Sequence, residues 1–264
     1  MKILFTICGR AGSKGIKNKN IRDFLGYKLP LYTLSAIDLY IKRHPEMECD
    51  VVANSDSLQL LDILCGTDYI LNQRRKTDSK LKVHRIERKN ELAGDRVAKI
   101  DFVCDCLCQM QDRLNKKYDM VVDLDITSPL RTVSNIEQLI QKKCESGCDI
   151  VYSVVESRRN PYFNMVMKSE KGYVKVCPSD FVARQQAPVI YDMNASMYAY
   201  EPSFLSSGKG VLEGYGEIIV MYDTGILDLD HENDFELMEV IAGWLFQNKD
   251  EFGEIKNNLE VVLD

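Results

Sequence analysis

Residues 1–155 alternate short apolar runs with amphipathic stretches, and this alternation is the feature that most restricts the fold. The apolar runs are rich in β-branched and aromatic residues, as in buried strands, and they span residues 3–7, 50–56, 120–124 and 149–155. Apolar residues at three- and four-residue steps predict helices opened by Pro30 and over residues 58–64, 96–114 and 135–144. We expect Gly66 to end the second of these helices. Such alternation predicts an α/β fold, a parallel sheet with helices on both faces.

The alternation stops between about residues 156 and 217, where polar, aromatic and proline-containing segments predict shorter strands and loops. This part is either an antiparallel extension of the sheet or an arm that mediates oligomerisation. We expect a solvated loop over the polar and basic residues 72–90. A strand over 218–222 and an amphipathic helix over 233–246 are predicted to close the chain. Because no repeat, low-complexity tract or linker interrupts it, we expect one domain over residues 1–264.

A glycine-rich, basic segment follows the first predicted strand. It reads Cys8-Gly-Arg-Ala-Gly-Ser-Lys-Gly-Ile-Lys-Asn-Lys-Asn20, with three glycines within seven residues. Glycines let the backbone turn sharply and approach a ligand closely. The first 22 residues hold six basic side chains and no acidic one, and exposed N–H groups with converging cations suit a polyphosphate. The spacing is neither the P-loop nor the G-x-G-x-x-G pattern, so the segment by itself also fits a plain surface turn.

The overall charge restricts the class of partner. A formal net charge of −6 over 264 residues argues against a general nucleic-acid binder and against binding to acidic membranes. No apolar run approaches the roughly 20 residues that a membrane-spanning helix needs. Met1-Lys2 leads straight into a strand-like run of five residues, which is too short for the apolar part of a signal peptide. We therefore expect a cytoplasmic protein with neither nucleic acid nor membrane as a partner.

Five segments, in order along the chain, resemble the motifs of one family. They are Gly9-Arg-Ala-Gly-Ser-Lys-Gly-Ile16 with Lys19-Asn-Ile21, then Arg88-Lys-Asn-Glu-Leu-Ala93, Thr127-Ser-Pro-Leu-Arg-Thr132, Arg184-Gln-Gln-Ala-Pro188 leading to Asn194, and Asp228-Leu-Asp230. Together they resemble the acylneuraminate cytidylyltransferases, also called CMP-sialic acid synthetases. The resemblance implies a Rossmann-like, mostly parallel sheet between helices, of the nucleotide-diphospho-sugar transferase type, with a smaller dimerisation extension.

The same resemblance implies a reaction and a nucleotide site. The reaction is transfer of a cytidylyl group from CTP to a 2-keto-3-deoxy nonulosonic (sialic-type) acid, with release of pyrophosphate. Such chemistry depends on positioning and on neutralisation of charge. By similarity, Arg10 and Lys19 are the catalytic cations, Asn20 faces the ribose and Arg88 reads the cytosine. The full set of implied nucleotide-binding residues is Arg10, Gly12, Ser13, Lys14, Lys19, Asn20 and Arg88.

The implied substrate-binding residues are Asp125, Ser128, Arg131, Arg184, Gln185, Asn194 and Tyr198. The forked guanidinium of Arg184 suits the sugar carboxylate, and Arg131 suits that carboxylate or a phosphate. Two positions depart from the family pattern. Asp125 stands where many members have glutamine, and Asp192 stands where they have arginine. These changes predict a sugar acid other than N-acetylneuraminate, and they leave open whether Asp125 binds the sugar or a metal ion.

A metal ion and a second subunit are also implied. Asp228 and Asp230 alternate with leucines, so in a strand both carboxylates project from one face. Magnesium uses one or two such carboxylates together with substrate phosphates. The resemblance therefore implies Mg²⁺ as cofactor at Asp228 and Asp230, and a homodimer formed through part of residues 156–217.

Two other functions remain open from the residues alone. A metal-dependent glycosyltransferase would use an Asp-x-Asp motif, for which Asp123-Leu-Asp125 and Asp228-Leu-Asp230 both qualify. An inactive nucleotide-binding module would bind CTP without turnover. The cations of the glycine-rich segment favour a triphosphate substrate over a nucleotide sugar. No residue stands out as the general base for the anomeric hydroxyl.

Overall fold

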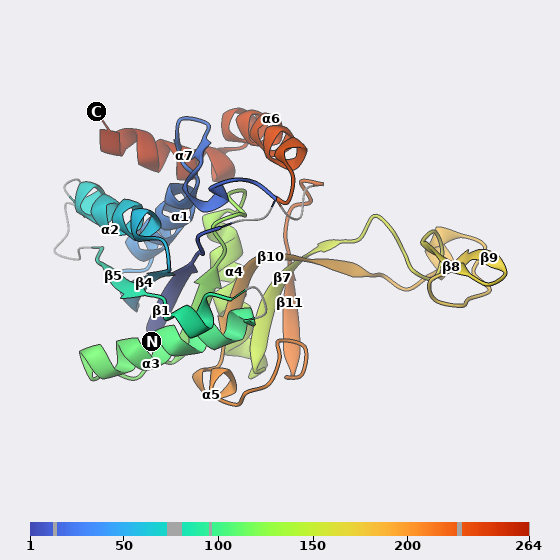
Figure 1. The fold of residues 1–264 in the computed structure, drawn as a ribbon, viewed down its shortest axis with the longest axis horizontal. Helices are drawn as coiled ribbons and strands as arrows, with labels where there is room; N and C mark the ends of the chain where they lie inside the picture. Colours follow the sequence, from blue (N-terminus) through green and yellow to red (C-terminus); the bar gives the residue numbers. More distant parts are fainter. Residues whose placement is uncertain (13–14, 73–80, 95–96, 226–228, 264) are drawn as a thin grey trace.

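The computed structural model describes residues 1–12, 15–72, 81–94, 97–225 and 229–263. A seven-stranded sheet with the order β11-β7-β10-β6-β1-β4-β5 forms its centre (Figure 1). The strands are β1 (Lys2–Cys8), β4 (Glu48–Ser55), β5 (Val83–Glu87), β6 (Met120–Leu124), β7 (Ile150–Glu156), β10 (Tyr191–Tyr200) and β11 (Gly216–Val220). All adjacent pairs are parallel except those made by β10, which runs antiparallel between β6 and β7.

Helices cover both faces of this sheet, and alternation along β1 shows how one strand serves two cores. Ile3, Phe5 and Ile7 face a core shared with α1, α2, α4, α6 and α7, while Leu4 faces a core shared with α3 and α5. The helices are α1 (Leu29–Arg43), α2 (Leu58–Asn72), α3 (Lys99–Leu114), α4 (Val133–Ser146), α5 (Pro202–Leu205), α6 (Glu232–Asn248) and α7 (Asp250–Leu263). The predicted α/β fold with a mostly parallel sheet is confirmed.

Short elements connect these layers or project from them. They are the 3-10 helices η1 (Lys19–Ile21), η2 (Asn90–Leu92) and η3 (Arg184–Gln186), and the two-stranded pairs β2 (Asp23–Phe24) with β3 (Tyr27–Lys28) and β8 (Val166–Ser169) with β9 (Gly172–Lys175). Figure 1 shows β8 and β9 at the end of an arm that extends well away from the sheet. This arm lies within the predicted excursion over 156–217.

Several predicted boundaries differ from the structure. Residues 191–200 of the excursion form β10, a central strand of the sheet, and a strand forms over Val83–Glu87 within the expected loop. The helix predicted from residue 96 begins at Lys99, and α7 was not predicted.

The expectation that Gly66 ends a helix is wrong, because α2 continues to Asn72. A glycine inside a helix costs only about 1 kcal/mol. The fully buried Leu60, Leu61 and Leu64 anchor this helix on the core and outweigh that cost. Among the described residues, no helix is both long and apolar enough to cross a bilayer.

Candidate active site

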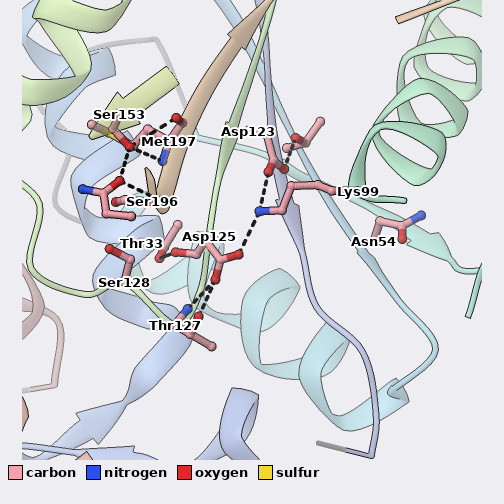
Figure 2. Close-up of polar contacts among 12 residues, drawn as sticks. Thr33, Asn54, Lys99, Asp123, Asp125, Thr127, Ser128, Ser153, Ser196 and Met197 are labelled. Atoms are coloured by element: carbon pink, nitrogen blue, oxygen red, sulfur yellow. Dashed lines mark hydrogen bonds and ion pairs between the residues drawn. The ribbon is translucent and has the colours of Figure 1, made fainter. Parts of the chain in front are cut away.

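The C-terminal ends of β1, β4 and β6 meet at one edge of the sheet, where ligands bind in open parallel sheets. The glycine-rich segment leaves β1 there, Asn54 lies near the end of β4, and Asp123 and Asp125 lie at the end of β6. Figure 2 shows the polar side chains that gather at this edge.

A pocket of about 280 Å³ opens at this edge and collects five of the predicted site residues. Arg10, Lys19, Asn20, Arg88 and Asp125 all line it. The rest of its lining comes from Cys8, Gly9, Leu92, Gly94, Val97, Lys99, Phe102 and Thr127. A smaller adjoining hollow of about 100 Å³ is lined by Gly12 and shares Arg10, Lys19 and Asn20 with the pocket. The structure thus brings together cations from three separate segments of the chain.

The glycine-rich segment is fixed by hydrogen bonds at its beginning. The N–H of Gly9 donates to the Asn54 carbonyl at 3.0 Å, and the N–H of Ala11 donates to Asp56 Oδ1 at 2.6 Å. The Asn20 amide donates to the Arg10 carbonyl at 3.0 Å. Gly9 is packed so closely that a Cβ there would lie 2.4 Å from Leu60 Cδ2. These contacts therefore fix the position of the backbone at Gly9 and Ala11 beside the pocket. Two predicted residues of this segment, Ser13 and Lys14, lie outside the described residues.

The far end of the segment contacts the stretch that holds Asp230. Lys19 Nζ donates to the Leu229 carbonyl at 2.7 Å and lies 3.7 Å from Asp230 Oδ1. A Cβ on Gly15 would lie only 1.8 Å from the Asp230 carbonyl oxygen. The Asp230 side chain itself is 71% exposed. One of the two predicted metal ligands thus lies next to a predicted triphosphate cation, whereas Asp228 lies outside the described residues.

Arg88 is held in the pocket wall by a neighbouring strand and a helix. Its Nε donates to Asn54 Oδ1 at 2.6 Å, and its guanidinium lies 4.1 Å from the centre of the Phe102 ring. The side chain is only 7% exposed. A planar donor group is therefore fixed in orientation at the wall of the pocket.

Asp125 is engaged by its own loop and by a lysine that sequence reasoning did not single out. Its Oδ1 accepts hydrogen bonds from the Thr127 N–H at 2.8 Å and the Thr127 hydroxyl at 2.7 Å. Its Oδ2 lies 2.8 Å from Lys99 Nζ (Figure 2). Burial by itself would raise the pKa of Asp125, but Lys99 and the Thr127 hydrogen bonds outweigh it and lower the pKa to about 2. At neutral pH Asp125 is therefore a poor general base.

Arg131 is placed differently from the expectation. It is 1% exposed, and its guanidinium donates to Thr33 Oγ1 at 3.3 Å and to the carbonyls of Asp125 and Ser128. Burial lowers its pKa to about 10, against the opposing effect of Asp125 and Asp123. The side chain fixes the loop over residues 125–131 from within, so the expected contact with a substrate anion does not fit this structure. Ser128 takes part through its carbonyl, which accepts from Arg131 at 2.7 Å.

The remaining predicted substrate residues lie apart from the 280 Å³ pocket. Arg184 and Gln185 are exposed on η3, where Arg184 Nη2 donates to the Ser157 carbonyl at 3.3 Å. Asn194 is 8% exposed and accepts from the Ser153 hydroxyl at 2.6 Å. Tyr198 is 7% exposed. Its ring lies 5.1 Å from the Lys99 ammonium, behind the pocket.

A second hollow lies near η3, at the end of β7. Its volume is about 520 Å³, and its polar lining includes Ser157, Arg158, Asp192 and Asp223. The Arg158 guanidinium pairs with Asp223 at 2.6 Å. Asp192 therefore lines the same hollow as Ser157, whose carbonyl accepts a hydrogen bond from Arg184.

The thiol of Cys8 is the one sulfur in the 280 Å³ pocket among the described residues. A hydrogen bond with Cys106 and burial both raise its pKa well above the ordinary value. A protonated thiol is a poor nucleophile. The pocket therefore supports catalysis by charge and position, without a covalent cysteine intermediate.

Comparison with curated proteins finds relatives along nearly the whole chain. Post-translational flagellin modification protein B of Campylobacter coli is 31% identical over 241 residues, which cover 91% of this chain and 94% of that protein. A CMP-N,N'-diacetyllegionaminic acid synthase of Campylobacter jejuni is also 31% identical, over 240 residues with the same coverage. An N-acylneuraminate cytidylyltransferase of Streptococcus agalactiae is 26% identical over 244 residues, and this chain covers 52% of it. No protein-family model matches the chain.

Solved structures share the fold. A CMP:2-keto-3-deoxy-manno-octonic acid synthetase complexed with CTP has a TM-score of 0.60 at 12% identity, over 92% of this chain and 99% of that one. A 4-diphosphocytidyl-2C-methyl-D-erythritol synthase from Anaerococcus prevotii has a TM-score of 0.52 at 14% identity, over 90% and 97%. These likenesses establish a Rossmann-like nucleotidyltransferase fold. With 31% identity to two relatives over 94% of each, the chain belongs to the acylneuraminate cytidylyltransferase family.

Proposed function

We propose that the protein transfers CMP from CTP to the anomeric hydroxyl of a nonulosonic acid and releases pyrophosphate. The observation that carries this proposal is the pocket at the sheet edge, where Arg10 and Lys19 of the glycine-rich segment converge with Arg88 from a second segment of the chain. Membership of a cytidylyltransferase family gives the reaction type, which is nucleotidyl transfer.

The chain's own contribution to this reaction is to hold cationic side chains in fixed positions before the substrates bind. The leaving pyrophosphate carries several negative charges, and Arg10 and Lys19 lie where they can neutralise them. Because the Gly9, Ala11 and Asn20 contacts fix the loop, little reorganisation is needed during transfer. A fixed donor of this kind raises kcat by about 10²–10³-fold. Arg88, fixed against Asn54 and Phe102, is suited to read the cytosine edge.

We propose that Asp228 and Asp230 hold Mg²⁺. The donor chemistry fits, since Mg²⁺ prefers carboxylates and completes its shell with substrate phosphates and waters. The exposed Asp230 carboxylate, 3.7 Å from Lys19 Nζ, supports this placement next to the triphosphate. When bound, the ion would neutralise charge on the phosphates. Manganese can replace magnesium as a paramagnetic probe, and Asp230→Asn should weaken Mn²⁺ binding in the presence of CTP; unchanged binding would contradict the assignment.

The sugar acid is proposed to be of the legionaminic type. One relative that is 31% identical is named for a diacetylated legionaminic acid. The carboxylate of Asp192 lines the 520 Å³ hollow beside Arg158 and Arg159, at a position where many family members carry arginine. Asp125 is held by Lys99 and Thr127. Its effect on the choice of sugar would therefore depend on the position of these two residues.

The arm supports a proposed homodimer. Large apolar side chains are exposed on β8 and β9, with Val166 at 62%, Met167 at 50% and Tyr173 at 75%. Burying such a surface is favourable at about 25 cal/mol per Å², and a second copy of the arm is the proposed partner. Light scattering should give about twice the mass of one chain; a 30.3 kDa species alone would contradict a dimer.

The reaction is tested by pyrophosphate release from CTP, Mg²⁺ and a panel of sugar acids. We expect release to require a nonulosonic acid, with higher kcat/KM for the diacetylated legionaminic acid than for N-acetylneuraminate. Consumption of a nucleotide sugar without pyrophosphate release would favour a glycosyltransferase. Tight CTP binding without turnover on any acid would favour an inactive module.

A further inference from the structure

Lys99 Nζ lies between the carboxylates of Asp123 and Asp125 in the wall of the pocket. It is 3.1 Å from Asp123 Oδ2 and 2.8 Å from Asp125 Oδ2 (Figure 2). The two aspartates are two residues apart on one strand end, so their carboxylates face the same side of the sheet. The ammonium occupies the position between them that a divalent cation would take in an Asp-x-Asp metal site.

The protein fixes the other oxygen of each carboxylate. The Thr6 hydroxyl donates to Asp123 Oδ1 at 2.6 Å, and Thr127 donates twice to Asp125 Oδ1. Both Oδ2 atoms are thereby directed toward one point, where Lys99 lies. The arrangement is a rigid holder for a single positive charge.

That charge is permanent over the physiological pH range. Burial would lower the pKa of Lys99, but Asp125 and Asp123 together raise it well above its ordinary value. The position of Lys99 at the N-terminus of a helix is also unfavourable for a cation. Lys99 is the first residue of α3, where the helix dipole disfavours positive charge. Its contacts with the two carboxylates, and not its place in the helix, explain why a lysine is held there.

The ammonium belongs to the pocket as well as to the carboxylates. The Lys99 side chain is 25% exposed and lines the pocket with Arg10, Lys19 and Arg88. Asp123 lies behind them at 1% exposure. Among the described residues, the wall thus presents four cations and the one carboxylate of Asp125. An ammonium has three N–H donors, and the two carboxylates account for two of them.

We propose that Lys99 is a substrate-binding residue whose ammonium, held by Asp123 and Asp125, donates to an anionic oxygen of the bound substrate. The oxygen belongs either to a phosphate of CTP or to the carboxylate of the sugar acid. The proposal rests on the proposed function for the identity of these two anions. It adds to the reaction a built-in cation at the strand end, in the place of a second metal ion.

The test compares Lys99→Met with the double variant Lys99→Met/Asp125→Asn. Lys99→Met leaves the buried Asp123 and the partly buried Asp125 without their cationic partner, so both stability and activity should fall. The double variant removes one of these charges and should recover much of the thermal stability. If Lys99 binds substrate, kcat/KM of the double variant should remain about 10²-fold below that of the single variant Asp125→Asn. A double variant with kcat/KM within about threefold of Asp125→Asn would show that Lys99 only balances charge, and would overturn the proposal.

Lys116→Met is the matched control. Lys116 also lies between two carboxylates, Glu48 and Asp50, but it contacts the start of β4, far from the pocket. Its loss should lower stability while kcat/KM stays within about threefold of wild type. An equal fall of kcat/KM in Lys116→Met would assign the Lys99 effect to stability and overturn the proposal.

Direct titrations identify the anion and need no turnover. Calorimetry with CTP alone, and with the sugar acid in the presence of a non-reacting CTP analogue, is carried out on wild type and the double variant. Weaker CTP binding assigns Lys99 to a phosphate, and weaker sugar-acid binding assigns it to the carboxylate. Unchanged affinity for both, together with unchanged kcat, would overturn the proposal. If the wild-type protein releases no pyrophosphate with any sugar acid, the proposed function fails, while the CTP titration still decides the phosphate contact.

Discussion

Replacing Gly15 by alanine tests whether the contact between the glycine-rich segment and residues 229–230 positions the site. A Cβ on Gly15 would lie 1.8 Å from the Asp230 carbonyl oxygen, and contacts below 3.0 Å essentially never occur. The two segments must therefore separate by about 1.2 Å or more. Both atoms of the clash are fixed close to the backbone, so a side-chain rotation cannot relieve it.

This shift falls directly on the predicted catalytic residues. Lys19 Nζ donates to the Leu229 carbonyl at 2.7 Å, a contact that a movement of this size would break. A misplacement of about 1 Å at a reacting centre can lower the rate about 10²-fold, or about 2.7 kcal/mol in activation free energy. Gly15 and Asp230 are themselves exposed, although Ile16 and Leu229 beside them are buried. We therefore expect kcat/KM to fall about 10²-fold while Tm falls by only a few degrees.

Steady-state pyrophosphate release and thermal melting measure the two effects side by side. Gly66→Ala is the control, since a Cβ there meets nothing within 4 Å and the residue lies inside α2. That variant should gain about 0.5–1 kcal/mol of stability and keep wild-type kcat/KM. A Gly15→Ala protein with wild-type kcat/KM would refute the view that this contact sets the geometry of the site.

Three further predictions concern other residues at this edge of the sheet. Arg10→Ala and Lys19→Ala should each lower kcat at saturating CTP by about 10²–10³; near-normal rates in both would show that the loop is not catalytic. Arg131→Met should cost about 3 kcal/mol of unfolding free energy in urea titrations, because it removes the buried donor to the Asp125 and Ser128 carbonyls; a cost near zero would contradict its role in fixing the loop. The pKa of Asp125 is lowered from 3.8 to about 2, so its contribution of about 2 kcal/mol should be complete above pH 3.8 and lost as pH falls through 2. The stability difference between wild type and Asp125→Asn should therefore shrink over that window, and a difference independent of pH would contradict the assignment.

Local sequence patterns determined much of the architecture. The runs over 3–7, 120–124 and 149–155 correspond to β1, β6 and β7, because a continuous apolar run of this length satisfies a strand buried on both faces. The cations and glycines between Cys8 and Asn20 also suggested a polyphosphate site, and the structure places Arg10, Lys19 and Asn20 in the pocket at the sheet edge. In each case the physical requirement acts over a few consecutive residues, so the sequence expresses it directly.

Other features depend on which segments become neighbours. β10 inserts antiparallel between β6 and β7, although its polar and aromatic sequence suggested part of an excursion. Residues 83–87 form an edge strand that pairs with β4. A strand's backbone hydrogen bonds are satisfied by the neighbouring strand, and no local sequence pattern predicts which strand that is.

Some residues of the site could likewise be predicted from the sequence, and others only from the structure. Its sequence motifs named Arg10, Lys19 and Arg88, but Lys99 carried no signal, because its partner Asp125 is 26 residues away. Arg131 was expected to bind substrate, whereas burial turned its guanidinium toward backbone carbonyls. The sequence by itself determined which charged residues the protein carries and where β1, β4, β6 and β7 lie. Only the tertiary structure decided which of those charges neutralise one another and which face the pocket, because electrostatic pairing depends on distance in space and on burial, and neither is a property of a residue's place in the chain.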